Sequence, residues 1–225
     1  MAVSQKVRRF MEEGGWIRRV FEEGMALKAQ IGADKVFDLS LGNPVMEPPQ
    51  EFHEELRRLA NAPISGMHRY MPNPGYMETR QAVADTLKSE SGLDFSAGDV
   101  IMTCGAAAAA NVVLKTILNE GDEVIILSPY FVEYVYYIDN HGGSAVIVPT
   151  GPEFQPDLGA IGAAVTSRTR AIIINSPNNP SGAVYPADLL QGLGELLLAK
   201  QAEHGSEIFI ISDEPYRRII YDGLA

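Results

Sequence analysis

Apolar side chains recur at helical spacing through the first part of the chain. Between residues 4 and 31 the spacing is interrupted by Gly14–Gly15, which predicts two short amphipathic helices joined by a hinge. Val36–Leu39 is a short apolar run bounded by turn-forming residues, and we expect a strand there. Proline-rich stretches precede two further predicted helices, at about residues 49–62 and 76–89.

After Asp99 the pattern changes to short apolar runs that alternate with longer amphipathic stretches. The predicted strands are Val100–Thr103, Glu123–Leu127, Ser144–Val148, Arg170–Ile174 and Glu207–Ile211. The predicted helices between them lie at about residues 107–118, 131–140, 157–164 and 186–204. Such alternation implies right-handed crossovers, so we predict an α/β fold with a doubly wound, mainly parallel sheet, preceded by an N-terminal helical segment.

Composition sets broad limits on what the chain does. With 225 residues and 46% hydrophobic content, it is long enough to bury a substantial core. The net charge of -11 argues against a nucleic-acid-binding surface, which needs clustered lysines and arginines. The single cysteine, Cys104, excludes an internal disulfide, and no stretch approaches the ~18 apolar residues of a membrane span. We therefore expect a cytoplasmic protein that binds neither nucleic acid nor membrane.

The most informative stretch follows the predicted strand at residues 170–174. The segment Asn175–Gly182 reads NSPNNPSG, so two prolines and a glycine fix a turn that carries three asparagines. In open α/β sheets, ligands bind at the carboxyl ends of the strands, where this turn is expected. The alternative interpretation is an ordinary connection between a strand and a helix, in which asparagines are common.

The string Asn-x-Pro-x-Asn-Pro-Ser-Gly resembles the cofactor loop of class I/II aminotransferases, the fold-type I enzymes that use pyridoxal 5'-phosphate. The resemblance implies that Asn179 bonds the phenolic oxygen of the cofactor and the substrate carboxylate, with Asn175 in support. It also implies amino-acid and 2-oxo-acid substrates. Further matches follow in the family's order from about Leu39 to Tyr216.

A second match lies where the strand predicted at residues 207–211 ends. Asp213 and Tyr216 reproduce the family's Asp-x-x-Tyr pattern. The resemblance implies that Asp213 pairs with the protonated pyridine nitrogen and that Tyr216 donates to the phenolic oxygen. The alternative for Asp213 is a helix N-cap, which its position also permits.

Other residues match the phosphate and ring positions of the family. Gly105, Ala106 and Ala107 open a predicted helix, where free N–H groups favour an anion, although small residues there also suit close helix packing. Phe131 matches an aromatic residue that stacks on the cofactor ring, and core packing is its alternative use. Tyr70 matches a tyrosine that reaches the phosphate of the partner subunit, which implies a homodimer in a complete protein.

The substrate position of the family is matched by Gly42, in Leu-Gly-Asn-Pro, together with Asn179. No metal site is predicted. The family's imine lysine follows the Asp-x-x-Tyr pattern, and none of the six lysines of this chain lies beyond Asp213. We therefore predict no catalytic residue within the chain, and we expect the chain alone to be inactive.

The resemblance gives a domain division and a consequence for the sheet. Residues 1–45 match part of a small domain, and residues 46–225 match a cofactor-binding large domain truncated before the imine lysine. In the family, two later strands lie between the strand matching 207–211 and the strand matching Val100–Thr103. Without them Val100–Thr103 loses its neighbours, so we expect a truncated enzyme or a half that needs a complementing C-terminal chain.

The leading function implied by the resemblance is transfer of an amino group from an amino acid to a 2-oxo acid. Two alternatives share the same motifs. One is a fold-type I carbon–sulfur lyase or synthase, and the other is a non-catalytic fragment or pseudoenzyme that only binds the cofactor or a partner chain.

Overall fold

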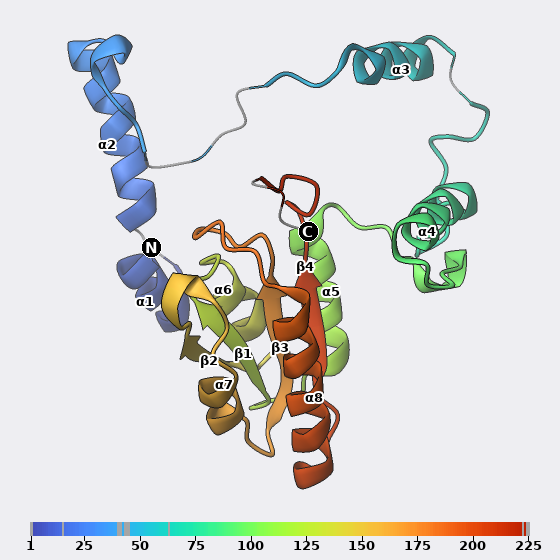
Figure 1. The fold of residues 1–225 in the computed structure, drawn as a ribbon. Helices are drawn as coiled ribbons and strands as arrows, with labels where there is room; N and C mark the ends of the chain where they lie inside the picture. The colour runs from blue at the N-terminus through green and yellow to red at the C-terminus, as the bar shows by residue number, and fades with distance from the viewer. Residues whose placement is uncertain are drawn as a thin grey trace. The chain divides into compact units, whose positions relative to one another are not determined.

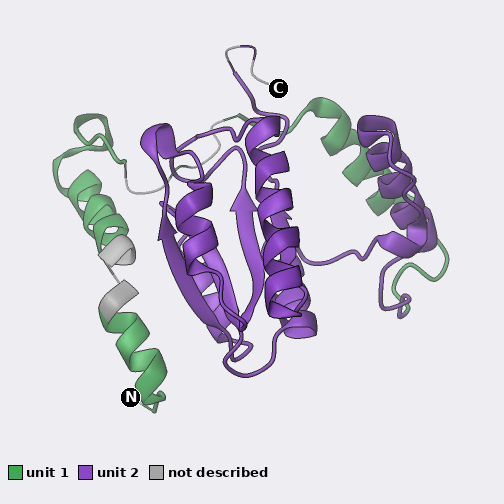
Figure 2. Cartoon of the chain, turned by 60° about the horizontal axis from the view of Figure 1, so that its bottom comes forward, with its two compact units in different colours: residues 1–69 green, residues 70–225 purple. Residues whose placement is uncertain are grey.

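The computed structural model describes residues 2–14, 16–39, 42, 46–62, 64–221 and 223, without the side chains of residues 13, 14 and 16–18. The second hinge glycine, Gly15, lies outside these residues. By its internal contacts the chain forms two compact units, residues 1–69 and residues 70–225 (Figure 2). The predicted domain boundary after residue 45 stays a prediction.

The first unit consists of helices. They are α1 (Gln5–Gly14), α2 (Trp16–Ile31), the short 3-10 helix η1 (Ala33–Lys35) and α3 (Gln50–Asn61). The predicted strand Val36–Leu39 is wrong, because no described strand of this unit offers its backbone a partner. Phe37 and Leu39 are instead 93% and 95% exposed. Lys28 of α2 donates to Asp38 Oδ2 over 2.7 Å and holds this extended segment against the helix.

The second unit contains the predicted sheet and its crossover helices (Figure 1). Its elements are α4 (Met77–Ser91), η2 (Ala97–Asp99), α5 (Ala106–Ile117), β1 (Glu123–Ser128), α6 (Tyr134–Asp139), β2 (Ser144–Pro149), η3 (Pro152–Phe154), α7 (Leu158–Ala164), β3 (Thr169–Asn175), α8 (Ala187–His204) and β4 (Phe209–Asp213). The four strands pair in parallel in the order β2-β1-β3-β4. The predicted α/β fold with a parallel sheet is confirmed.

Each face of the sheet carries its own apolar layer. On one face Ile125 and Ile172 pack with Leu193 and Leu197 of α8 and Ile161 of α7. On the other face the residues of the alternate positions pack with α5 and α6; they are Val124, Ile126, Ala171 and Ile173, with Leu114, Tyr134 and Ile138. Successive strand residues point to opposite faces, so the apolar runs of β1 and β3 supply both layers.

The predicted strand Val100–Thr103 is also wrong, because its backbone finds partners outside the sheet. Met102 N–H donates to the Pro74 carbonyl over 2.9 Å. The buried Arg80 of α4 donates from Nε to the Val100 carbonyl over 2.8 Å. A strand needs a neighbouring strand, and none of the described strands lies next to this segment.

Two boundaries shift in ways that matter for the site. The helix expected from Phe131 begins at Tyr134, because residues 131–134 form a turn in which Tyr134 N–H donates to the Phe131 carbonyl. The last strand extends to Asp213 instead of ending at Ile211, since Asp213 still pairs with Asn175 of β3. Asp213 therefore lies within the sheet edge itself.

Candidate functional site

The candidate site lies at the carboxyl edge of the sheet, where β3 and β4 end side by side. Asn175 and Asp213 are register partners at these two ends. Asn175 is only 4% exposed, and its Nδ2 donates to the Asp213 carbonyl over 2.8 Å. Its Oδ1 accepts the Asn179 N–H over 2.6 Å. One buried amide therefore fixes both the end of β4 and the start of the asparagine loop.

The rest of the asparagine loop, residues 175–182, is held by hydrogen bonds within the loop and to the residues that directly follow it. Gly182 N–H donates to the Asn178 carbonyl over 2.8 Å, and the buried Asn178 side chain accepts from both N–H and Oγ of Ser181. Ser176 Oγ accepts the Tyr185 N–H over 2.9 Å. The loop is thus preorganised by the side chains that its sequence supplies.

The Asp213 carboxylate accepts a hydrogen bond from a tyrosine that the sequence did not single out. Tyr134 Oη donates to Asp213 Oδ2 over 2.6 Å, and Oδ1 has no partner among the described residues. Among the residues described after Asp213 no helix begins, and residues 215–218 form a turn instead. The helix-cap alternative for Asp213 is therefore wrong, and the carboxylate is directed to the sheet edge.

Tyr134 was missed because it belongs to none of the motifs, and α6 was expected to begin earlier, at Phe131. It is 4% exposed and contacts Phe131 and Tyr137 edge to face, with ring centroids 5.6 and 6.4 Å apart. Burial, together with the neighbouring Asp213 carboxylate, raises the pKa of Tyr134 far above its usual range. The spacing of three residues from Phe131 was a usable signal, because it directs both rings to one side of a helical turn.

A cavity of about 250 Å³ opens beside these groups. It is lined by seven of the residues predicted for the site, from β3, β4, the asparagine loop, α5 and the segment before α6: Ala106, Ala107, Phe131, Asn175, Asn179, Asp213 and Tyr216. Tyr134, Tyr137, Ala110 and Pro215 complete the wall. The structure thus places most of the predicted site around one cavity.

The amino end of α5 forms one wall of this cavity. Gly105 is its N-cap, with φ +88, a conformation that side chains with a Cβ rarely adopt. Ala106 and Ala107 follow in the first turn, where backbone N–H groups have no partner within the helix. Gly105 itself is not among the residues that line the cavity. This wall offers backbone donors and a favourable dipole to an anion.

Besides Gly105, two further predicted residues do not line the cavity. Tyr70 is the first residue of the second unit, and its side chain is fully exposed. Gly42 lies exposed in the first unit, and a Cβ built on it would meet no atom within 4 Å. The Asn43–Pro44 turn that follows Gly42 lies outside the described residues. The roles predicted for Tyr70 and Gly42 stay predictions.

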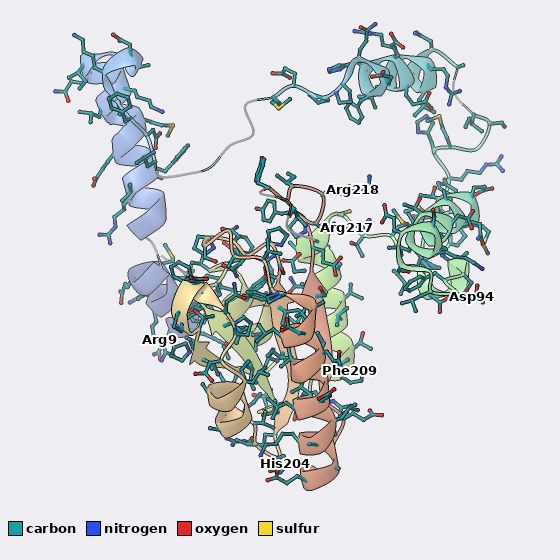
Figure 3. The ribbon with its side chains drawn as sticks, viewed as in Figure 1. Arg9, Asp94, His204, Phe209, Arg217 and Arg218 are labelled. Atoms are coloured by element: carbon teal, nitrogen blue, oxygen red, sulfur yellow. The ribbon has the colours of Figure 1, made fainter. Side chains whose placement is uncertain are left out.

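Beyond β4 the chain turns back toward another part of the second unit. Arg217 and Arg218, labelled in Figure 3 near the end of the strand, both pair with Glu90 of α4. These two hydrogen bonds lower the pKa of the Glu90 carboxyl. Both cations are thereby engaged away from the cavity, and no lysine or arginine in the described part of the chain lines it.

The cavity suits a phosphorylated pyridine ring. Asp213 offers a carboxylate to a cationic ring nitrogen, and Asn179 and Tyr216 can donate to a ring oxygen. Phe131 offers an aromatic face, and the first turn of α5 offers donors to the phosphate. In the described part of the chain no cluster of His, Cys, Asp or Glu is placed to hold a metal ion, and no helix is long and apolar enough to cross a membrane.

Comparison with known proteins gives one family. Residues 34–224 match the family model described as aminotransferase class I and II. The aspartate/prephenate aminotransferase of Thermus thermophilus is 39% identical over 187 residues, covering 82% of this chain and 46% of that protein. Aromatic-amino-acid aminotransferase 2 of Thermococcus litoralis is 33% identical and covers 100% of this chain.

Solved structures agree with the sequence matches. An amino transferase from Eubacterium rectale superposes with a TM-score of 0.94 at 38% identity, covering 100% of this chain and 57% of its own. The Thermus thermophilus aspartate aminotransferase with maleate gives a TM-score of 0.80 at 35% identity, covering 92% of this chain and 52% of its own. The chain spans about half the length of the relatives that it matches.

Proposed function

The chain belongs to the class I and II aminotransferases, and from this membership we propose that it forms the pyridine- and phosphate-binding part of a pyridoxal-phosphate enzyme. The observation that carries the proposal is the cavity at the ends of β3 and β4, which gathers Asp213, Asn179 and Phe131 around the first turn of α5. When bound, pyridoxal phosphate accepts electrons from an amino-acid substrate.

In this proposal each wall of the cavity has a separate task. Asp213 accepts a hydrogen bond from the protonated ring nitrogen and keeps the positive charge on the ring. Asn179 and Tyr216 orient the ring by donating to its phenolic oxygen, and Phe131 covers one face of the ring. The N–H groups of Ala106 and Ala107 hold the phosphate.

We propose that a complete enzyme containing these residues moves an amino group from an amino acid to a 2-oxo acid. It is further proposed to act as a homodimer in the cytoplasm, with Tyr70 reaching the phosphate of the partner subunit and Gly42 meeting the substrate carboxylate. The exposed position of Tyr70 leaves its ring free for such a contact. None of the described lysines or arginines lines the cavity, and the imine lysine is proposed to come from a complementing segment.

The exposed edge of the sheet supports the proposal of a complementing segment. Among the described strands, β4 pairs with β3 alone, so its outer edge presents free backbone groups. A cavity of about 370 Å³, lined by apolar residues such as Val113 of α5 and Ile211 of β4, adjoins that edge. A further parallel strand there would form hydrogen bonds with the free backbone groups of β4 and would cover the apolar wall.

A binding experiment with pyridoxamine 5'-phosphate tests the proposal, because this form carries the ring and phosphate but needs no lysine. Calorimetric titration of the 225-residue chain should show one site per chain. Asp213→Ala should weaken binding by about 10-fold to 100-fold, which is the loss of a charge-assisted hydrogen bond. Glu153→Ala, an exposed site in η3 on a different segment, serves as the control and should leave the affinity unchanged.

Two results would contradict the proposal. The first is absence of saturable binding by a chain whose circular dichroism shows the α/β fold. The second is equal affinity of wild type and Asp213→Ala, which would place the ligand elsewhere.

A further inference from the structure

Tyr134 is fixed by the core more firmly than the carboxylate to which it donates. Its ring belongs to the apolar layer formed by Leu114, Ile126 and Ile138, and it is 4% exposed. The contacting rings of Phe131 and Tyr137 restrict it further. Asp213 instead ends a strand whose first two residues, Phe209 and Ile210, are 40% and 45% exposed. The hydroxyl is therefore the better-fixed partner of this hydrogen bond.

The chemistry of the donor also matters. A lysine or arginine beside Asp213 would neutralise the carboxylate before any ligand arrived, and the cavity lining that the structure describes contains neither. The Tyr134 hydroxyl is neutral, and burial raises its pKa so that it keeps its proton and can donate. The hydrogen bond occupies Oδ2 over 2.6 Å but leaves the negative charge of the carboxylate uncompensated. A half-buried carboxylate in this state favours a cation as its next partner.

From this geometry we propose that Tyr134 is a positioning residue for Asp213: its hydroxyl holds Oδ2 and turns Oδ1 toward the cavity for the cationic ring nitrogen. The inference rests on the proposed function. Tyr134 of α6 then helps to select a protonated pyridine ring. The sequence motifs assign this selection to Asp213 of β4 alone. Asn175 also contacts this aspartate, because its Nδ2 donates to the backbone carbonyl of Asp213.

The two hydrogen bonds divide the work of placing Asp213. The bond from Asn175 Nδ2 fixes the backbone at the end of β4, and the bond from Tyr134 Oη fixes the rotation of the side chain. Without the hydroxyl, the carboxylate keeps its charge but samples more than one rotamer. Such a change should weaken the contact with the ring nitrogen and leave contacts to the phosphate intact.

A pair of ligands separates this role from a general structural one. Pyridoxamine 5'-phosphate and its 1-deaza analogue differ only at the ring nitrogen, which the analogue replaces with C–H. The ratio of their dissociation constants therefore reports the contact between Asp213 and the nitrogen. A residue that only supports the fold should weaken both ligands alike and leave the ratio unchanged.

The wild-type chain is expected to prefer the nitrogen-containing ligand by about 10-fold or more, the value of one hydrogen bond to a charged group. Tyr134→Phe should reduce this preference by about 5-fold, mostly by weakening pyridoxamine 5'-phosphate. Tyr185→Phe is the matched control, because Tyr185 is also 4% exposed but packs in the layer on the opposite face of the sheet. It should keep the wild-type preference.

A third variant makes the test independent of any small change in folding. In an Asp213→Asn background, Tyr134→Phe should leave the ligand preference unchanged, since the charge that the hydroxyl directs is gone. Two results would overturn this inference but not the proposed function. The first is a Tyr134→Phe chain that keeps the full wild-type preference for the nitrogen-containing ligand. The second is a Tyr134→Phe change that reduces this preference as much in the Asp213→Asn background as in wild type. A folded wild-type chain that binds neither ligand, or shows no preference, would overturn the proposed function and this inference with it.

Discussion

Strands β3 and β4 lie side by side in the sheet and have similar apolar sequences, but their surroundings differ. β3 pairs with β1 on one side and β4 on the other, and the side chains from Ala171 to Asn175 are all buried. β4 pairs with β3 alone among the described strands, and Phe209 at its start, labelled in Figure 3, has a side chain that is 40% exposed by its accessible surface. Burial of an apolar run therefore depends on its paired neighbours as well as on its residues.

The difference explains how an exposed strand can carry the carboxylate of the site. The interior strand contributes Asn175, which is buried and bonds to the backbone of Asp213 over 2.8 Å. The core helix α6 contributes the Tyr134 hydroxyl, which bonds to its side chain over 2.6 Å. The end of β4 is thus positioned by its better-buried neighbours, while the rest of the strand stays exposed.

The largest effect should come from shortening equivalent isoleucines in the two strands. Ile172 and Ile210 are register partners, and Ile172 is 0% exposed whereas Ile210 is 45% exposed. Ile172→Ala should lower the free energy of unfolding by about 2–5 kcal/mol, because it removes buried methyl groups and leaves a cavity. Ile210→Ala should cost less than about 1 kcal/mol. Urea unfolding followed by circular dichroism measures both, and equal losses would contradict the contrast between the strands.

A smaller effect should follow from cutting the link between β3 and β4. Asn175→Ala removes the bonds to Asp213 and Asn179 and should cost about 1–3 kcal/mol of stability, since it leaves buried polar groups unpaired. The matched variant is Asn178→Ala, which removes two bonds to Ser181 within the same loop and should cost a similar amount.

The two asparagine variants should differ in ligand binding. Asn175→Ala should weaken pyridoxamine 5'-phosphate about 10-fold, because the end of β4 loses its anchor, and Asn178→Ala should have a smaller effect. Calorimetric titration at a temperature where both variants remain folded gives the comparison. Equal affinities for the two variants would show that the link from β3 does not position Asp213.

The smallest effect is expected at high pH. Burial raises the folded-state pKa of Tyr134 above its unfolded value of about 10, so the unfolded chain loses this proton first. The contribution of Tyr134 to the free energy of unfolding is then fully present below about pH 10. It declines as the pH rises further, by at most about 1.4 kcal/mol per pH unit. Tyr134→Phe should therefore lose stability less steeply than wild type between about pH 10 and 11. Identical slopes in urea titrations would argue against a buried, protonated hydroxyl.

The sequence correctly predicted the helices and the strands that are paired within the sheet. The helices and the strands β1, β2 and β3 were found close to their observed bounds, because their periodicity and flanking turn residues are local signals. The strands predicted at Val36–Leu39 and Val100–Thr103 were wrong, since an apolar run does not reveal whether another strand will lie beside it.

The residues of the candidate site also differ in whether local sequence could predict them. The asparagine loop and Asp213 could be predicted, because a short motif at the end of a strand determines the local backbone geometry by itself. Tyr134 could not be assigned, because its partner Asp213 lies 79 residues away in the chain and the contact exists only in the folded sheet. Tyr70 and Gly42 were predicted by resemblance alone, and neither lines the cavity.

The most direct test of the central claim is the protonation state of the bound ring. Pyridoxamine 5'-phosphate labelled with ¹⁵N in the ring can be added to the chain, and the nitrogen chemical shift can be followed by NMR as the pH is raised. With Asp213 at the ring nitrogen, the bound ring should remain protonated at pH values where the free ligand has lost that proton, and Asp213→Ala should abolish the difference. A bound ring that titrates like the free ligand in the wild-type chain would contradict the placement of the cofactor at this site.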